Sequence, residues 1–292
     1  MSGLTTLRDY IRWAMSQFSQ AQLYFENGSE SAFEEARSLV LRSLHLPYEL
    51  HDKYLDCHVH TDEHAVLQGV LKQRIEQRLP TAYVLGEAWF AGMLLKIDQR
   101  VMVPRSPLDE LISQQFEPWL SKMPLRILDL CAGSGCLGIA CAHEFPEAEV
   151  LLTDISQAAL AIADENIALQ QLSERVQTLH SDMFAQLTAQ RFDLIVCKPP
   201  YISAEQWSQL PLEYQHEPKQ GSIAAEQGLE FIQQVIQQAG EYLAEDGLLV
   251  LEVGPHQAQL IAQYPDIDFT WLEHSHTGNG VLALTAQQCV AY

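Results

Sequence analysis

The sequence predicts an α/β fold in which a mostly parallel sheet, covered by helices on both faces, follows a small helical domain. Residues 1–86 carry apolar side chains at helical spacing. From about residue 105, short apolar runs typical of buried strands alternate with helix-period stretches. Such alternation is typical of parallel strands joined by helices. The 292 residues are enough for two modest domains, each with its own core.

The first 86 residues contain three amphipathic stretches in which apolar residues recur every three or four positions. They are Leu4/Leu7/Ile11/Met15, then Phe33/Ala36/Leu39/Val40, then Val66/Leu67/Val70/Leu71/Ile75. We therefore predict a helical domain over residues 1–86. Residues 88–95 and 96–103 have the character of short strands, so residues 87–104 are predicted to form a β-hairpin linker, ended by Pro104 and Pro107.

Residues 105–292 are predicted to form the α/β domain. Its expected parallel strands are residues 125–130, 149–153, 176–180, 192–197 and 248–253. Ser156 is a suitable N-cap for a helix that runs to Leu169. Phe269–Glu273 and Gly280–Leu284, joined by a Gly/Asn turn, predict a terminal antiparallel pair.

The charge of the chain is strongly acidic and unevenly distributed. Residues 1–104 hold 10 basic and 13 acidic side chains, whereas residues 105–292 hold 7 and 25. Such a surface repels nucleic acid and attracts basic partners, although it is also compatible with a surface that only keeps the protein soluble. The six scattered cysteines and the absence of a signal peptide or a membrane-length apolar stretch favour a cytoplasmic protein.

A glycine-rich loop, Cys131-Ala132-Gly133-Ser134-Gly135, follows the first predicted strand of this domain and opens a helix. Glycine permits a sharp turn and a close approach of a ligand to the backbone. Asp154, followed by Ile155, ends the next strand, where a carboxylate can accept hydrogen bonds from both hydroxyls of a ribose. This spacing matches the dinucleotide fingerprint, so an NAD enzyme, and a glycine turn without a ligand, are alternatives.

Two acids near this loop favour S-adenosylmethionine over NAD. Asp129 stands before the glycines, where it can contact a positively charged methionine group but would disfavour a pyrophosphate. Asp182 follows the third strand and can accept from an adenine amino group, with Met183 packed against the ring. A capped strand-to-helix turn is the alternative for Asp182.

The fourth predicted strand ends in the turn Lys198-Pro199-Pro200-Tyr201. With the glycine loop and Asp154, this turn resembles the seven-stranded class I methyltransferases that modify planar amide or amino nitrogens. The chain is similar over essentially its whole length to the protein-glutamine methyltransferases that act on the third protein of the large ribosomal subunit. The segments that carry this similarity are Tyr10–Phe18, residues 88–92 (Ala-Trp-Phe-Ala-Gly), 103–107 (Val-Pro-Arg-Ser-Pro), 216–218 (His-Glu-Pro) and 271–273 (Trp-Leu-Glu). Residues 105–107 fit this family better than the related enzymes that act on peptide-chain release factors.

The resemblance implies the fold, the cofactor and the partner. It implies a seven-stranded class I sheet, S-adenosylmethionine as cofactor, no metal, and a basic ribosomal protein as substrate, which the helical domain helps to dock. It also implies that the residues of the turn orient the amide and that Arg105, His216, Glu217 and Pro218 lie near the substrate. In the family the turn is usually Asn-Pro-Pro-Tyr. The Asn side-chain oxygen and the first proline carbonyl accept hydrogen bonds from the amide, and Tyr201 is expected to line the pocket.

Lys198 departs from that pattern, because a charged lysine donates hydrogen bonds and cannot accept them. Loss of one preorganised hydrogen-bonding group commonly lowers a rate ~10²–10³-fold. We therefore expect an impaired or inactive enzyme. The alternative is that Lys198 turns to solvent or pairs with an acid such as Glu217, leaving a gap for water.

The same residues are compatible with other functions. A non-catalytic module that binds the cofactor and grips the ribosomal protein is one alternative, and an adenine amino-methyltransferase, which shares the Pro-Pro-Tyr turn, is another. The acidic charge argues against the latter. The segment from Cys57 to His64 contains metal-ligand residue types, but a solvated helix start capped by Thr61 is the favoured interpretation.

Overall fold

The computed structural model describes residues 3–25, 31–188, 190–224, 228–275 and 280–290, and the chain forms two compact units. The smaller unit consists of Met1–Ala88, Ile97–Gln99 and Leu210–His216, and the larger of Trp89–Lys96, Arg100–Gln209 and Glu217–Tyr292. None of the described helices is long and apolar enough to cross a membrane.

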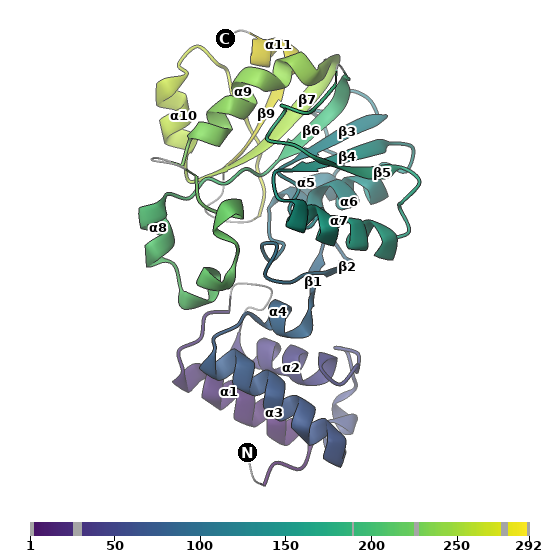
Figure 1. Ribbon diagram of the computed structural model, residues 1–292, viewed down its shortest axis with the longest axis vertical. Coiled ribbons are helices and arrows are strands. Elements are labelled where there is room, and N and C mark those ends of the chain that lie inside the picture. The colour runs from purple at the N-terminus through teal and green to yellow at the C-terminus, as the bar shows by residue number, and fades with distance from the viewer. Residues whose placement is uncertain (1–2, 26–30, 189, 225–227, 276–279, 291–292) are drawn as a thin grey trace. The chain divides into compact units, whose positions relative to one another are not determined.

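Within the described residues, the smaller unit contains the α-helices α1 (Leu7–Gln20), α2 (Ala32–Arg42), α3 (Thr61–Glu76) and α4 (Thr81–Leu85), as labelled in Figure 1. The three predicted amphipathic stretches fall on α1, α2 and α3 and on the residues next to them. Thr6 caps α1 by accepting from Asp9 N at 3.1 Å, while the Asp9 carboxylate accepts from Thr6 N at 3.0 Å. The helices bury one shared core, which includes Tyr10, Phe18, Leu39, Leu67 and Leu71.

The N-cap of α3 differs from the expectation. His60 takes this position: its Nδ1 accepts from Asp62 N, and its own N–H donates to the Glu63 carboxylate at 2.7 Å. Thr61, which was expected to be the cap, is the first residue of the helix. A histidine imidazole can accept a backbone hydrogen bond as a hydroxyl does, so the capping geometry forms one residue earlier.

A buried ionic network joins the segment Leu210–His216 to the helices of the smaller unit. Arg74, only 1% exposed, places Nε 2.5 Å from Glu35 Oε1 and Nη1 3.4 Å from Glu213 Oε1. Arg78 Nη2 lies 2.9 Å from the same Glu213 oxygen. Burial raises the pKa of Glu35, and the positive charge of Arg74 opposes that rise. Opposite charges in contact make burial of these groups tolerable.

The hairpin is shorter than predicted. Strands β1 (Glu87–Phe90) and β2 (Met93–Lys96) are joined by Ala91 and Gly92, whose φ angles are +46° and +74°. Two consecutive positive φ angles are the signature of a tight hairpin turn. The turn thus falls inside the run 88–95, and the prediction that residues 96–103 form a second strand is wrong.

Asn166 of α7 (Gln157–Leu169) fixes β2 within the larger unit. Its Oδ1 accepts from Lys96 N at 2.7 Å, and its Nδ2 donates to Lys96 O and to Ser134 O, both at 3.0 Å. Asn166 is completely buried, and its bond to Ser134 O is buried with it. Ser156 caps α7 as predicted, accepting from Ala159 N at 3.2 Å.

The larger unit contains the predicted seven-stranded, mostly parallel sheet, and this prediction is confirmed. The strand order is β5-β4-β3-β6-β7-β9-β8. The bounds are β3 Arg126–Leu130, β4 Glu149–Asp154, β5 Val176–His180, β6 Phe192–Cys197, β7 Leu243–Gly254, β8 Thr270–Trp271 and β9 Gly280–Thr285. Strands β3 to β7 pair in parallel, and β9 runs antiparallel to both β7 and β8. The expected turn between β8 and β9 lies outside the described residues.

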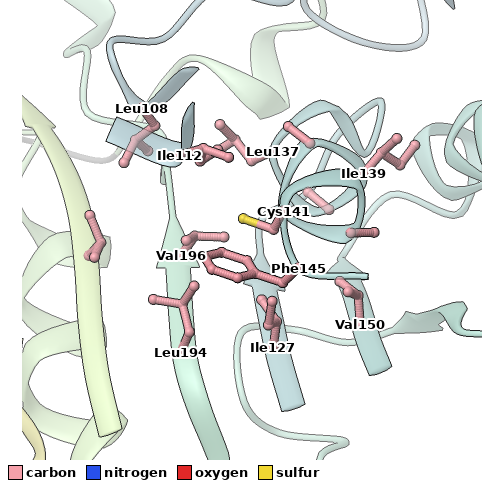
Figure 2. Close-up of a cluster of buried hydrophobic side chains, with 14 of the residues drawn as sticks. Leu108, Ile112, Ile127, Leu137, Ile139, Cys141, Phe145, Val150, Leu194 and Val196 are labelled. Atoms are coloured by element: carbon pink, nitrogen blue, oxygen red, sulfur yellow. The ribbon is translucent and has the colours of Figure 1, made fainter. Parts of the chain in front are cut away.

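Helices cover both faces of this sheet (Figure 1). One face packs against α5 (Leu108–Ser113), α6 (Cys136–Glu144) and α7, and Figure 2 shows part of that core, where Phe145 lies among Ile127, Leu194 and Val196. The other face packs against α9 (Glu230–Tyr242), α10 (Gln257–Gln263) and α11 (Ala286–Val290). A further short helix, α8 (Ala204–Gln209), follows β6.

The chain leaves β3 toward β4 on one side, while β6 joins the sheet on the other side of β3. In open α/β sheets such a switch in strand order opens a crevice at the carboxyl ends of the two strands. The glycine loop follows β3 and the Lys198 turn follows β6, so the fold brings the two predicted halves of the site to one place.

Candidate active site

A cavity of about 260 Å³ lies in the larger unit at the carboxyl ends of β3, β4 and β6. Most of the residues predicted for the site line this cavity. They are Arg105, Cys131, Ala132, Gly133, Ser134, Asp154, Ile155, Asp182, Met183, Lys198, Pro200 and Pro218. Asp129, Gly135, Pro199, Tyr201, His216 and Glu217 do not line it.

The glycine loop turns the chain from β3 into α6. Cys131, Gly133 and Gly135 have φ angles of +64°, +56° and +80°. At Gly135 a β-carbon would lie 2.9 Å from Leu152 Cδ1, so a side chain there would both strain the backbone and collide with β4. At Gly133 no heavy atom lies within 4 Å of the β-carbon position, which leaves the backbone open to the cavity that it lines.

Asp154 ends β4 and is held by the backbone around it. Its Oδ2 accepts from Gly133 N and its Oδ1 from Ser156 N, both at 2.8 Å. Each carboxylate oxygen retains a second lone pair, and the residue lines the cavity. Burial raises the pKa of Asp154, while the two N–H groups oppose the rise. This anchored acceptor fits a pair of ribose hydroxyls.

Asp129 lies beneath the loop rather than in the cavity wall. It is fully buried, and its Oδ2 accepts from Gly138 N in the first turn of α6 at 2.8 Å. Its Oδ1 has no hydrogen-bond partner within the described part of the chain. Burial raises the pKa of Asp129 to about 7, and the charge of Asp154 adds to the rise. In this structure, Asp129 therefore braces the start of α6.

The segment after β5 also lines the cavity. Ser181 Oγ donates to Met183 O at 2.7 Å, and Met183 has a φ angle of +49°. The Met183 sulfur lies 3.6 Å from the Cys131 sulfur, so the two positive-φ residues from different loops meet at the cavity. The exposed Asp182 lines the cavity beside them, and its contact with an adenine stays a prediction.

Lys198 pairs with an acid, but not with the one expected. Its Nζ lies 2.9 Å from Glu252 Oε1 and donates to Arg105 O at 2.6 Å. Glu252, on β7, is completely buried. The alternative that Lys198 pairs with an acid is therefore the one observed, with Glu252 in the place suggested for Glu217. The register of β6 and β7, in which Cys197 lies opposite Leu251, brings Glu252 next to Lys198.

Glu252 also accepts hydrogen bonds from two hydroxyl groups. Tyr201 donates to its Oε1 at 2.8 Å, and Ser106 donates to its Oε2 at 2.6 Å. One carboxylate thus connects the start of α5, the Lys198 turn and the middle of the sheet. A buried acid with two hydroxyl donors and an ammonium ion beside it is well compensated.

Glu217 has a different partner. Its two oxygens accept from Arg105 Nη1 and Nη2 at 2.6 and 2.7 Å, and it is only 3% exposed. A bidentate pair of this kind fixes the guanidinium plane. His216 belongs to the smaller unit, where its Nε2 contacts Gln77 O at 2.9 Å. Of the three predicted neighbours, Glu217 therefore orients Arg105, Pro218 lines the cavity, and His216 does neither.

The expectation that Tyr201 lines the pocket is wrong: Tyr201 is not part of the cavity lining and instead stabilises the turn. Its carbonyl accepts from His256 Nε2 at 2.8 Å. A β-carbon on Gly254, where φ is +57°, would lie 2.6 Å from Tyr201 Cε2, so the ring rests directly on that glycine. Pro199, between Lys198 and Pro200, is buried.

Sequence reasoning missed Glu252, Ser106 and His256. Glu252 was the detectable one, because it is the only charged residue within the apolar run 248–253. An isolated acid in a buried strand signals a buried partner. Among the described residues, no three His, Cys, Asp or Glu side chains are arranged to hold a metal ion.

Comparison with protein families matches residues 111–211 to the methyltransferase small domain. Two curated relatives align with nearly the whole chain, and both are named ribosomal protein uL3 glutamine methyltransferase. The one from Francisella tularensis subsp. tularensis is 42% identical, over 100% of this chain and 94% of its own. The one from Xanthomonas campestris pv. campestris is 41% identical, over 99% of this chain and 94% of its own.

The solved structures that resemble this chain share its fold at low sequence identity. The hMettl16 catalytic domain in complex with MAT2A 3'UTR hairpin 1 matches with a TM-score of 0.54 and 15% identity, over 81% of this chain and 84% of that one. The same domain with hairpin 6 gives a TM-score of 0.52 and 16% identity, over 77% of this chain and 82% of that one. At this identity the likeness shows the fold alone.

Proposed function

Because the chain belongs to the family of the ribosomal protein uL3 glutamine methyltransferases, we propose that it transfers a methyl group from S-adenosylmethionine to a glutamine side-chain amide of that ribosomal protein. The observation that carries this proposal is the single cavity lined both by the glycine loop with Asp154 and by the Lys198 turn. A cofactor site and an acceptor site that open into one space are what a direct transfer requires.

The residues present fit the cofactor. Asp154, anchored by two backbone N–H groups, would hold the ribose hydroxyls, and Asp182 with Met183 would hold the adenine. The open backbone at Gly133 would accommodate the methionine part. When bound, S-adenosylmethionine supplies an electrophilic methyl group on a sulfonium ion.

The amide must be activated by the protein, since its nitrogen lone pair is delocalised. Hydrogen-bond acceptors directed at the amide N–H groups localise charge on nitrogen and orient it. In the family the carbonyl at the position of Pro199 has this role; here Pro199 is buried and does not line the cavity, so its carbonyl would have to be reached from Pro200 and Lys198, which do. Lys198 provides only donors, and its ammonium is already paired with Glu252 and bonded to Arg105 O. We therefore expect amide methylation to be slower by ~10²–10³ than in a chain with Asn at this position.

The acidic surface supports a basic protein partner. Residues 105–292 hold 7 basic and 25 acidic side chains, which suits a basic ribosomal protein and disfavours a nucleic-acid substrate. The helical residues 1–86 would help to dock this protein. Residues 87–104 would form the linker between the domains, and residues 105–292 would catalyse the methyl transfer. The reaction would take place in the cytoplasm.

The test compares the native chain with Lys198→Asn, using labelled S-adenosylmethionine and uL3. We expect weak transfer by the native chain and a gain of ~10²–10³ in Lys198→Asn. Equal, fast transfer by both would refute the role given to the acceptor. Cofactor binding without transfer in either protein would favour a module that binds the cofactor and uL3 but does not catalyse.

A further inference from the structure

The ammonium of Lys198 is held by two contacts. Its Nζ lies 2.9 Å from Glu252 Oε1 and donates to Arg105 O at 2.6 Å. The Lys198 side chain is 16% exposed and lines the cavity, whereas Glu252 is completely buried. Among the described residues, Glu252 is the one acid within ion-pair distance of this ammonium. The charge of Lys198 is therefore compensated directly by a single carboxylate.

The surroundings of Glu252 stabilise its negative charge. Besides the ammonium, two hydroxyl groups donate to the carboxylate, Ser106 to Oε2 at 2.6 Å and Tyr201 to Oε1 at 2.8 Å. Hydrogen bonds to an ionised group are stronger than those between neutral groups. Glu252 does not line the cavity, so its charge reaches a bound ligand through Lys198 and not through a contact of its own.

The other acids of the site are placed less well to compensate Lys198. Strand β3 lies between β4, which ends at Asp154, and β6, which leads to Lys198. Two strand spacings separate these positions by about 10 Å. Asp182 follows β5, which is one strand farther away. Asp129, on β3, accepts from the first turn of α6. Glu252 is on β7, the direct neighbour of β6.

A lysine beside the acceptor turn is a difficulty for the proposed cofactor. The sulfur of S-adenosylmethionine is positively charged, whereas the sulfur of the product, S-adenosylhomocysteine, is neutral. Because the methyl group must reach an amide held at the Lys198 turn, the sulfonium has to bind on the side of the cavity that Lys198 lines. Like charges repel strongly in such a partly buried place. An ammonium without a counterion would therefore weaken the binding of S-adenosylmethionine more than that of S-adenosylhomocysteine.

We propose that Glu252 is a positioning residue for the cofactor site: its buried carboxylate holds the Lys198 ammonium and cancels its charge, so that a sulfonium can bind in the same cavity. This inference rests on the proposed function, because it takes S-adenosylmethionine as the cofactor. The chain thus has a neutral ion pair at the position where the family usually has a neutral asparagine. Glu252 thereby contributes to the discrimination between the cofactor and its demethylated product.

Binding of the two ligands tests this inference without any transfer. Calorimetry measures the affinities of S-adenosylmethionine and S-adenosylhomocysteine, whose ratio isolates the charge on sulfur. We expect Glu252→Gln to lower the affinity for S-adenosylmethionine about tenfold or more, and that for S-adenosylhomocysteine less than about threefold. Adding Lys198→Met to Glu252→Gln removes the ammonium as well, and should restore the native ratio. Ser106→Ala, the matched control, removes one hydrogen bond to Glu252 but no charge, and should keep the native ratio.

The outcomes separate this inference from the proposed function. Equal losses of affinity for both ligands in Glu252→Gln would mean that Glu252 acts through shape and hydrogen bonding, and would overturn the inference. A changed ratio that persists in the double variant, or that appears equally in Ser106→Ala, would overturn it too. In each case the native chain still binds S-adenosylmethionine, and the proposed function stands. A native chain that binds neither ligand would overturn both. Thermal unfolding of each variant shows that it is folded.

Discussion

Replacing Glu252 with Gln would remove the negative charge beside Lys198 while keeping the shape of the side chain. The amide of Glu252→Gln can still accept from Tyr201 and donate to Ser106, so the change isolates the charge. Glu252 is completely buried, and the Lys198 side chain is 16% exposed. Removing one partner of a fully buried pair costs ~3–5 kcal/mol. Because Lys198 is partly exposed, water can hydrate its unpaired ammonium and reduce this cost. We therefore expect the free energy of unfolding to fall by about 2–3 kcal/mol.

A double-mutant cycle with Lys198→Asn measures the coupling. In the Lys198→Asn background no ammonium remains to be left unpaired, and Glu252→Gln should cost less than about 1 kcal/mol. Urea unfolding provides the free energies, and hydrogen exchange of peptides from β7 assigns the transition to the larger unit. Glu147→Gln, at an exposed position, is the matched control and should shift the free energy by less than about 0.5 kcal/mol.

The same loss in both backgrounds would refute this reasoning. It would mean that Glu252 acts through its hydroxyl partners, Tyr201 and Ser106, and that the 2.9 Å contact with Lys198 contributes nothing. A coupling free energy of about 2 kcal/mol would instead show that the carboxylate of Glu252 stabilises the charge of Lys198.

Three further predictions concern other buried charges. The pKa of Asp129 is about 7 in the folded chain and about 3.9 when unfolded, so its contribution to stability is full below pH 4 and is lost as pH rises through 7. Asp129→Asn should reduce the decrease in the free energy of unfolding between pH 4 and 8, measured by urea unfolding. The same pH dependence in the variant would contradict a raised pKa of Asp129. Asp154→Asn should weaken cofactor binding ~10–100-fold by calorimetry, because a charged acceptor is lost, and wild-type affinity would contradict a ribose role. Glu213→Gln should lower the stability of the smaller unit by about 3 kcal/mol, since among the described residues Arg74 then keeps only Glu35 as a charged partner; an unchanged melting transition of that unit would exclude this.

The fold could be predicted because its signals are local. Strand β6 was predicted at its observed bounds, Phe192–Cys197, since an apolar run between polar residues shows both ends of a buried strand. The hairpin could not be placed, because its turn consists of Ala91 and Gly92 inside an apolar run, and a positive φ at alanine leaves no trace in the sequence. The N-cap at His60 was missed for a related reason, since histidine seldom takes that role.

The cofactor half of the site was more predictable than the acceptor half. The glycine loop and Asp154 depend on spacing along the chain, and spacing can be read directly. The partner of Lys198 depends on strand register, because Glu252 lies 54 positions away on β7. Glu217 is near Lys198 in the sequence and was suggested as its partner, but the Glu217 carboxylate is paired with Arg105. The roles of all these residues in binding and transfer remain predictions.

Asn166 shows how much can depend on one carboxamide. Its oxygen and both hydrogens of its nitrogen are engaged, by Lys96 N, Lys96 O and Ser134 O. Aspartate has the acceptor but neither donor, glutamine is one methylene too long, and an aliphatic side chain would leave three backbone groups without these partners. The position should therefore tolerate no replacement, although Asn166 does not line the cavity. A variant found there in nature would be expected to loosen β2 and the glycine loop together, and so to change affinity from outside the binding site.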